Sequence, residues 1–428
     1  MKIVATAFLL VLFISVFSNA QCVSDPTPTE TGPVLKLLKL KQKTAAEIGL
    51  SLTANVAGAS WKVKGSEGAV ITVFVDGKYS QDVMLFAGSR PFDYKVLLGR
   101  VEAGNHEFTI RLNKPRSSAN AQNVTVSSAR RFAIDSNGKN AVEDRIAIEN
   151  SPFLYARPDA VDRFSDIPLI TYYEIIKDGQ GAFTVRYTTI FTNEDGGTQT
   201  AALLARWGRT TDIEWVYEMS YKNGKLVGET FQGANHVTTR FAGVRVFGGH
   251  PLIYTVTDNN NFADKGCSKL RIAPLPIYAD LSAGSRETVM DTNPWTYRLM
   301  AEEAQREGRI DPQNMGVDRI DDLRNYVYAT VFIDSGAKTV AVEIVTADGN
   351  TSRSDAGDYR LRISRPGYQR IAVHLPQTGQ PIKSLKLLCH TSAGNREPVE
   401  CGGSKVVGFT TLDKNYEIKN GNAALVAR

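Results

Sequence analysis

The chain has 428 residues, of which 22% are charged and 42% hydrophobic, and its formal net charge is +5. At roughly 100–200 residues per domain, this length predicts two to four domains, each large enough for its own core. The net charge is small for the length and the basic residues are scattered, which argues against nucleic acid as a partner.

Residues 1–20 have the features of a secretory signal peptide. Lys2 supplies a positive start, an apolar stretch runs from Ile3 to Phe17, and Ser18-Asn19-Ala20 places small residues at the cleavage position. The apolar stretch is too short to span a membrane, and no later stretch approaches the roughly 20 residues of a spanning helix. We therefore predict cleavage after Ala20, a secreted or periplasmic location and no membrane span.

Four cysteines, an even number, fit disulfides in an exported chain. Cys389 and Cys401 lie close in sequence, with two glycines directly after the second, and are predicted to pair. A loop of this size stabilises the fold by about 3 kcal/mol. Cys22 and Cys267 then remain, and their pairing has no further support in the sequence. The sequence contains no C-x-x-C spacing, so the cysteines do not indicate a zinc or redox site.

The exported chain is predicted to begin with a linker and a β-sandwich. Residues 21–45 start with three prolines among Thr and Glu, a composition typical of an extended linker. Over 46–135, alternating stretches separated by turns, with a hairpin signal at Asp76-Gly77, predict strands. Asp93 to Gly99, followed by Ala103 to His106, resembles the closing strands of jelly-roll carbohydrate-binding modules. That resemblance implies a carbohydrate-binding module over 46–135.

Residues 150–282 are predicted to form a central β domain that holds the candidate site. Its strands are separated by glycine turns, and Asn223-Gly224 between two alternating stretches is a strong hairpin signal.

A helical connector and a further β-sandwich are predicted after the central domain. Within a helical connector over 283–325, Asn293 is expected to cap a helix from Pro294 to Glu307, with Gly308 as its stop. Residues 326–428 again alternate and predict a C-terminal β-sandwich. The predicted fold class is therefore mainly β, with three consecutive β-sandwich or jelly-roll-like domains and one helical connector.

The window from Asn193 to Glu218 gathers recognition-type side chains more densely than any other part of the chain. In a strand, side chains two residues apart share a face, so Asp212, Glu214 and Glu218 are expected on one face and Trp215 on the other. One interpretation is a solvated ladder of ion pairs, with Arg186 of the preceding strand across from a carboxylate.

The second interpretation makes Asp212 and Glu214 a catalytic acid/base pair, in which one group protonates a glycosidic oxygen and the other attacks or activates water. Asp212-Ile213-Glu214-Trp215 resembles part of the Glu-Ile-Asp-Ile-Glu strand of the jelly-roll β-glucanases. In that family the nucleophilic Glu stands two residues before the Asp. That position is Thr210 here, so the resemblance does not extend to the retaining mechanism.

Arg206, Trp207 and Arg209 are candidate ligand-binding residues. Guanidinium groups bind carboxylates or sugar hydroxyls, and an indole offers a stacking face. The alternative places Trp207 in the core and both arginines in salt bridges.

Two histidines and one aspartate complete the candidate site. His236 and His250 lie on glycine-rich turns, and Asp195 directly precedes Gly196-Gly197. Functional residues gather on loops, so we assign His236 to the catalytic set and Asp195 and His250 to ligand binding.

Asp258, Asn260 and Asp264 form a candidate metal site. Their oxygens lie within one short loop and are of the type that calcium requires, which makes calcium the cofactor this loop suits. The EF-hand spacing is absent, and Asn and Asp also form turns without a metal.

Tyr172-Tyr173-Glu174, Asn193 to Thr198, Trp207 to Asp212 and His250-Pro251 resemble a group of exported bacterial multi-domain β proteins. The resemblance implies no activity. From the residues themselves we expect an exported protein that acts on or binds extracellular polysaccharide or a cell-surface glycan. As an enzyme it would be a glycoside hydrolase or polysaccharide lyase. The alternative is a non-catalytic adhesion or envelope structural protein, stabilised by calcium.

Overall fold

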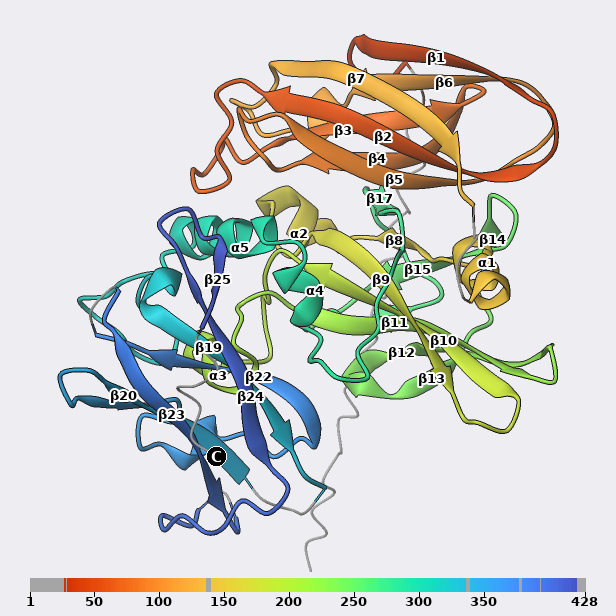
Figure 1. Ribbon diagram of the computed structural model, residues 1–428. Helices are drawn as coiled ribbons and strands as arrows, with labels where there is room; N and C mark the ends of the chain where they lie inside the picture. Colours follow the sequence, from red (N-terminus) through yellow and green to blue (C-terminus); the bar gives the residue numbers. More distant parts are fainter. Residues whose placement is uncertain are drawn as a thin grey trace, which may run out of the picture.

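The computed structural model describes residues 27, 29–135, 140–335, 339–376, 379–392 and 394–421. Within these ranges the chain is mainly β and contains several separate sheets and few helices (Figure 1). The predicted signal peptide and Cys22 lie outside the described residues. No helix in the described ranges is long and apolar enough to cross a membrane.

The N-terminal unit, red to orange in Figure 1, contains a four-stranded sheet, β1-β6-β3-β4, and a three-stranded sheet, β5-β2-β7. Leu50 of β2 and Phe108 of β6 belong to the same hydrophobic core, so the two sheets pack against each other. The elements are β1 (Val34–Gln42), β2 (Ala46–Val56), β3 (Ala69–Val75), β4 (Lys78–Leu85), β5 (Phe92–Val101), β6 (Gly104–Leu112), the 3-10 turn η1 (Lys114–Arg116) and β7 (Val124–Ala133).

Part of the predicted linker is in fact a strand. Residues 34–42 form β1, which pairs along β6. Leucines alternate with lysines here, and Leu40 is buried while Leu35 and Leu38 pack against the core. The predicted Asp76-Gly77 hairpin turn is confirmed, because it joins β3 to β4 with both residues at positive φ.

The central unit, yellow to green in Figure 1, is built on a six-stranded sheet in the order β13-β12-β11-β10-β9-β18. The Asn223-Gly224 hairpin predicted between β11 and β12 is confirmed, with φ of 50° and 71°. The strands are β9 (Pro168–Lys177), β10 (Ala182–Phe191), β11 (Ile213–Lys222), β12 (Lys225–Gln232), β13 (Thr238–Arg240) and β18 (Ile277–Tyr278).

A smaller sheet and short helices complete the central unit, where the sequence predicted strands alone. The helix over 200–207 was missed although its alanines and leucines favour a helix and Gly208 ends it in the left-handed conformation. These elements are α1 (Ala141–Glu149), β8 (Phe153–Tyr155), α2 (Pro158–Arg163), α3 (Thr200–Trp207), the 3-10 turn η2 (Ala234–His236), β14 (Arg245–Val246), β15 (His250–Thr255), β16 (Phe262–Ala263) and β17 (Arg271–Ile272).

The predicted connector helix is confirmed as α5 (Trp295–Arg306), preceded by the single turn α4 (Thr288–Asp291). Its predicted cap is wrong, because the Asn293 side chain donates back to the carbonyl of Val289 and so belongs to the end of α4. Helix α5 lies beside the N-terminal unit, where Trp61 Nε1 donates to Glu303 Oε2 at 2.7 Å in a buried position.

The C-terminal unit, cyan to blue in Figure 1, contains the sheets β22-β19-β24-β25 and β21-β20-β23. Val331 of β19 and Val342 of β20 share one core, so these sheets also pack together. The elements are η3 (Leu323–Asn325), β19 (Tyr326–Ile333), β20 (Thr339–Thr346), β21 (Thr351–Arg353), η4 (Tyr359–Leu361), β22 (Gly367–His374), β23 (Ile382–His390), β24 (Lys405–Leu412) and β25 (Ile418–Asn420).

The disulfide predicted between Cys389 and Cys401 is confirmed, and it ties the end of β23 to the loop before β24. None of the cysteines within the described residues is free. The pairing of Cys22 with Cys267 stays a prediction, since Cys22 is outside those residues.

Arg370 of β22 fastens the C-terminal unit to the connector. Its guanidinium is buried and donates to Asp291 of α4 through two bonds, of 2.5 Å and 3.2 Å. Gly208, at the end of α3, lies so close that a Cβ there would be 2.5 Å from Arg370 Cγ. The central unit, the connector and the C-terminal unit therefore meet at the buried guanidinium group of Arg370.

Replacement of Arg370 by Ala should destabilise this junction. It removes one partner of a buried ion pair, which costs about 3–5 kcal/mol of unfolding free energy. Chemical denaturation measures the loss. Arg360→Ala is the control, because Arg360 pairs with Asp358 at the exposed surface and its removal should leave the unfolding transition unchanged. An Arg370→Ala protein as stable as the control would contradict the assigned role.

Candidate functional site

The candidate site is a pocket of about 340 Å³ where the central and C-terminal units meet. Three stretches of the central unit form most of it: the segment between β10 and β11, the end of β12 with η2, and the residues before α4. One residue comes from the C-terminal unit, on the loop before β22. The lining residues are Glu194, Thr198, Trp207, Arg209, Asp212, Glu214, Trp215, Gln232, His236, Asn259, Arg286 and Arg365.

Backbone geometry between β10 and β11 carries the charged residues to this pocket. The amide of Glu194 donates to the carbonyl of Thr210, which places the two ends of the segment side by side. Between them, α3 runs from Thr200 to Trp207 and ends at Gly208, whose φ of 62° reverses the chain. Arg209 and Asp212 follow within four residues of that reversal, so both reach the cavity that Glu194 lines.

The strand that carries Glu214 contains a β-bulge, and the predicted alternation along it is wrong. Glu214 pairs with Thr189 and Glu218 with Arg186, with Val216 as the extra residue. Thr189 and Arg186 are three residues apart, so their side chains lie on opposite faces of the sheet. Glu214 and Glu218 therefore do not share a face, and Trp215 as well as Glu214 lines the pocket.

Glu218 pairs with Arg186, as the ion-pair interpretation predicted for one carboxylate of the strand. Asp212 and Glu214 have other partners. Asp212, 2% exposed, accepts from the amide of Ile213 at 2.8 Å and from Asn260 Nδ2 at 3.0 Å. Glu214 Oε2 accepts from Gln232 Nε2 at 2.6 Å. The strand thus divides its carboxylates between a surface ion pair and the pocket.

Three carboxyl groups of the pocket have raised pKa values. Burial and then the charge of Asp212 raise the pKa of Glu194 to about 8. Burial and then the charge of Glu214 raise the pKa of Asp212 to about 7. Burial also raises the pKa of Glu214, against the charge of Arg286 and the bond from Gln232. Near neutral pH the pocket therefore holds protonated carboxyl groups, which can donate a proton, beside ionised carboxylates, which can accept one.

A buried ion pair lies directly behind these acids. Arg209 Nε donates to Glu287 Oε1 at 3.0 Å, and both side chains are almost fully buried. Burial alone would raise the pKa of Glu287, but the charges of Arg209 and Arg286 are among those that outweigh it and hold that pKa below its usual value. Glu287 is thus the ionised carboxylate of this region.

His236 stands at the mouth of the pocket with its side chain 51% exposed. Its Nδ1 lies 2.6 Å from Gln232 Nε2 and 3.9 Å from Glu214 Oε2, while Nε2 lies 2.8 Å from Asn259 Nδ2. Asn235 and His236 both have φ near +58°, in the left-handed region, which is uncommon for non-glycine residues although Asn and His adopt it more readily than most. Strain of this kind is often found at functional sites.

Trp207 and Arg209 line the pocket, but Arg206 does not. Trp207 also packs against the core of the C-terminal unit, as the core interpretation predicted, while its place in the pocket leaves ligand binding a prediction. Arg206 donates to the carbonyl of Arg360 and lies over the ring of Trp207, with 5.9 Å between its Cζ and the ring centroid.

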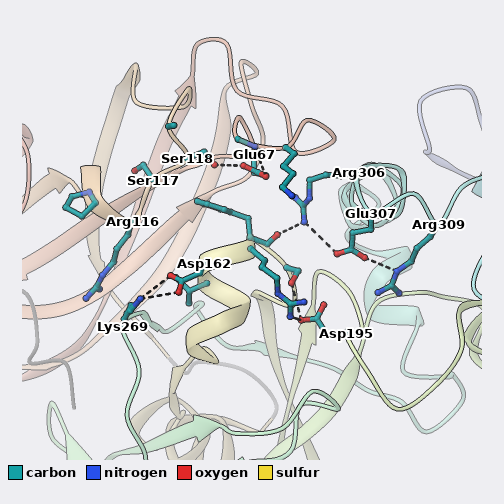
Figure 2. Close-up of a pocket in the computed structure, with 18 residues that line it drawn as sticks. Glu67, Arg116, Ser117, Ser118, Asp162, Asp195, Lys269, Arg306, Glu307 and Arg309 are labelled. Carbon is teal, nitrogen blue, oxygen red and sulfur yellow. Dashed lines mark hydrogen bonds and ion pairs between the residues drawn. The ribbon is translucent and has the colours of Figure 1, made fainter. Parts of the chain in front are cut away.

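Asp195 points away from its neighbour Glu194 and into a separate cavity of about 1000 Å³ between the N-terminal and central units. Figure 2 shows it below the charged row of Arg306, Glu307 and Arg309. Asp195 Oδ2 accepts from Arg157 at 2.5 Å and from Arg163 at 2.7 Å. The structure therefore does not bring Asp195 to the pocket of Asp212 and Glu214.

His250 is fully buried elsewhere. Its Nδ1 lies 2.9 Å from the carbonyl of Ser151 and its Nε2 lies 3.0 Å from Glu47 Oε2 of β2. The contact with Glu47 joins the central unit to the N-terminal unit, and His250 does not line the pocket of Asp212 and Glu214.

The three residues of the predicted calcium loop have separate protein partners. Asp258 Oδ1 accepts from Arg157 at 2.6 Å, Asn260 Nδ2 donates to both Asp166 and Asp212, and Asp264 Oδ2 accepts from the amide of Ala242. Across the described part of the chain, no group of three His, Cys, Asp or Glu side chains is placed to hold a metal ion.

The sequence analysis missed Glu194, Gln232, Arg286 and Arg365 as pocket residues. Glu194 stands beside the chosen Asp195, and the sequence gives no sign which of the two faces the site. Arg286 and Arg365 are distant from the window in sequence and reach the pocket only through the packing of the units. No local signal could have found them.

Comparison with known proteins gives no family. No protein-family model matches the chain, and no curated protein matches it. Among solved structures, it is similar to one described as the C-terminal domain of EclA, a sugar-binding protein, with 12% sequence identity and a TM-score of 0.19. The match covers 28% of this chain and 86% of that domain. At this TM-score, nothing is transferred from that domain to this chain.

The raised pKa of Glu194 leads to a pH-dependent effect of its removal. In the unfolded chain Glu194 ionises near pH 4.5, but in the fold only near pH 8, so folding stability falls as the pH rises between these values. Glu194→Gln has no such cost. As the pH rises from 5 to 9, the unfolding free energy of this variant should therefore increase by on the order of 2–4 kcal/mol relative to that of the wild type.

Denaturant unfolding at both pH values measures this difference. Glu102→Gln is the control, because Glu102 is exposed and its removal should change stability equally at both pH values. If Glu194→Gln also shows the same effect at pH 5 and pH 9, Glu194 is not held protonated by the fold.

Proposed function

We propose that this protein is an exported enzyme that hydrolyses an extracellular glycan in the pocket of Asp212 and Glu214. The observation that carries the proposal is the set of carboxyl groups in that pocket, whose pKa values burial and mutual repulsion raise to different degrees. Glycosidic bond cleavage requires one carboxyl group that donates a proton and another that accepts one. The raised pKa of Asp212, about 7, lets it hold a proton to donate near neutral pH, while the charges of Arg286 and Arg209 favour the ionised form of Glu214.

In the proposed reaction, Asp212 is the general acid and protonates the oxygen of the leaving sugar. Glu214 is the general base and takes a proton from water, whose oxygen bonds to the anomeric carbon as the glycosidic bond breaks. The charges of Arg209 and Arg286 act on both carboxyl groups and favour their ionised forms, so each can lose its proton again. Gln232 lies between Glu214 and His236 and links both groups at the mouth.

Trp207 and Trp215 offer apolar ring faces on the pocket wall, and sugars bind to such faces through their C–H groups. In this proposal, the chain consists of three consecutive β-sandwich or jelly-roll-like domains. The N-terminal one serves as a carbohydrate-binding module, and the C-terminal one completes the pocket. Export is supported by the apolar start of the chain and by the Cys389–Cys401 disulfide, since such bonds persist in oxidising compartments.

Asp212→Asn and Glu214→Gln should each lower the rate of glycan hydrolysis by about 10²–10⁴-fold. Each amide keeps the shape of the side chain but cannot transfer the proton. Release of reducing ends from a panel of plant and bacterial polysaccharides measures the rate. Glu218→Gln is the matched control, because Glu218 lies on the same strand but pairs with Arg186 outside the pocket.

Equal activity of the two amide variants and the control would exclude the catalytic roles. If the two variants instead lose stability while glycan binding persists, the carboxylates are structural. The protein would then be a non-catalytic adhesion or envelope protein.

Calcium binding at Asp258, Asn260 and Asp264 is kept as a separate proposal. Calcium that binds only the folded state would raise the Tm with its concentration. The Tm in millimolar calcium should therefore exceed that in chelator, and Asp258→Asn should reduce the difference. An identical Tm under both conditions would rule out the site.

A further inference from the structure

Within the described residues, two cations of the pocket form no ion pair. Arg209 forms an ion pair with Glu287, but neither Arg286 nor Arg365 forms one with any of the described residues. The hydrogen bond of the Arg286 guanidinium goes to the backbone carbonyl of Ile213. Arg365 stands on the exposed loop just before β22 and lines the pocket from the opposite unit.

The charges of these two arginines act on each other. The charge of Arg286, followed by burial, lowers the pKa of Arg365. Like charges repel, and the charges of Glu214 and Glu287 act against this repulsion without restoring the pKa of Arg365. An anion bound beside Arg365 would relieve the repulsion that remains. The protein itself supplies no ion-paired carboxylate to either group among the residues described. The cost of placing two cations at one pocket therefore points to an anionic group of the ligand.

The acids of the pocket do not prevent an anion from binding. The raised pKa values of Glu194 and Asp212 leave both groups partly or mostly uncharged at neutral pH. The ionised Glu287 is already paired with Arg209 and does not line the pocket. Glu214 is the pocket carboxyl group whose charge acts on both arginines. With Glu194 and Asp212 partly or mostly uncharged, Arg286 and Arg365 face a cavity that carries less negative charge than the number of its carboxyl groups suggests.

We propose that the pocket selects an acidic sugar, whose negatively charged group is bound by Arg286 and Arg365. Guanidinium groups bind carboxylates and sulfates through parallel N–H bonds, which makes them suited to this task. A hexuronic acid carboxylate and a sugar sulfate ester share that chemistry. The inference rests on the proposed function, because it names the class of glycan that the same pocket would take.

The dimensions of the pocket fit one bound sugar unit. About 340 Å³ lies near the lower end of the roughly 300–1,000 Å³ found for small-molecule sites. Trp207 and Trp215 would contact the ring, while the two arginines would contact its acidic group. Since Arg365 belongs to the C-terminal unit, the acidic sugar would be held from both sides of the junction.

Calorimetric titration of the full chain with three oligosaccharides of equal length tests the proposal. The probes are an oligogalacturonate, a sulfated galactan oligomer and a neutral galactan oligomer. The Asp212→Asn protein is used, so that the probes are not consumed. We expect at least one acidic probe to bind tenfold or more tightly than the neutral one, and the stronger of the two identifies the charged group as carboxylate or sulfate.

Arg365→Gln and Arg286→Gln, each combined with Asp212→Asn, should weaken binding of that acidic probe by about 10–100-fold, the usual effect of losing hydrogen bonds to a charged group. Binding of the neutral probe should not change. Arg360→Gln is the control, since Arg360 is an exposed arginine of the same unit outside the pocket. Because Arg365 is exposed, its replacement is expected to leave the Tm unchanged.

The outcomes separate this inference from the proposed function. Equal affinity for acidic and neutral probes would overturn the inference, and so would an acidic preference that survives both arginine substitutions. In either case, hydrolysis of a neutral glycan by the wild type would still support the proposed glycan-hydrolysing function. If the preference for the acidic probe is lost in the arginine variants and the wild type hydrolyses none of the probes, the inference is supported and the proposed hydrolytic activity is rejected. Failure of all three probes to bind would overturn the inference.

Discussion

The ion pair between Glu287 and Arg209, buried just behind the pocket, is the interaction on which the rest of the site depends. A buried carboxylate is tolerated only when cations compensate it, and here Arg209, Arg286 and the arginine of β22 do so. Arg209 also acts on Glu194 and Asp212, and Arg286 on Asp212, but these charges do not overcome the burial of the two groups. One carboxylate thus stays ionised while its neighbours retain protons. In the proposed reaction the acid and the base are Asp212 and Glu214, and the charges of Arg209 and Arg286 act on both.

This charge arrangement exists only because separate parts of the chain pack together. Glu287 directly precedes α4, Arg209 follows α3, and Arg370 reaches Asp291 from β22. Gly208 permits the close approach, since any side chain there would collide with Arg370. The C-terminal unit is therefore a part of the site, both through the arginine that lines the pocket and through the one that fixes the junction.

Local signals in the sequence predicted the features that depend on a few adjacent residues. The Asn223-Gly224 hairpin, helix α5 and the Cys389–Cys401 bond follow from turn geometry, helix-stop chemistry and loop length. The bulge at Val216 could not be predicted in this way, because it depends on the register with β10. Arg365 could not be predicted as a pocket residue either, because only the packing of two units brings it to Asp212 and Glu214.

The measurement closest to the central claim is the protonation of the pocket itself, without any ligand. Infrared difference spectroscopy detects the C=O stretch of a protonated carboxyl group, and wild type minus Glu194→Gln isolates the signal of Glu194. The account predicts that this signal persists at pH 6.5, falls to about half near pH 8 and disappears at higher pH. A Glu194 that is already ionised at pH 5 would contradict the charge balance on which the proposed chemistry rests.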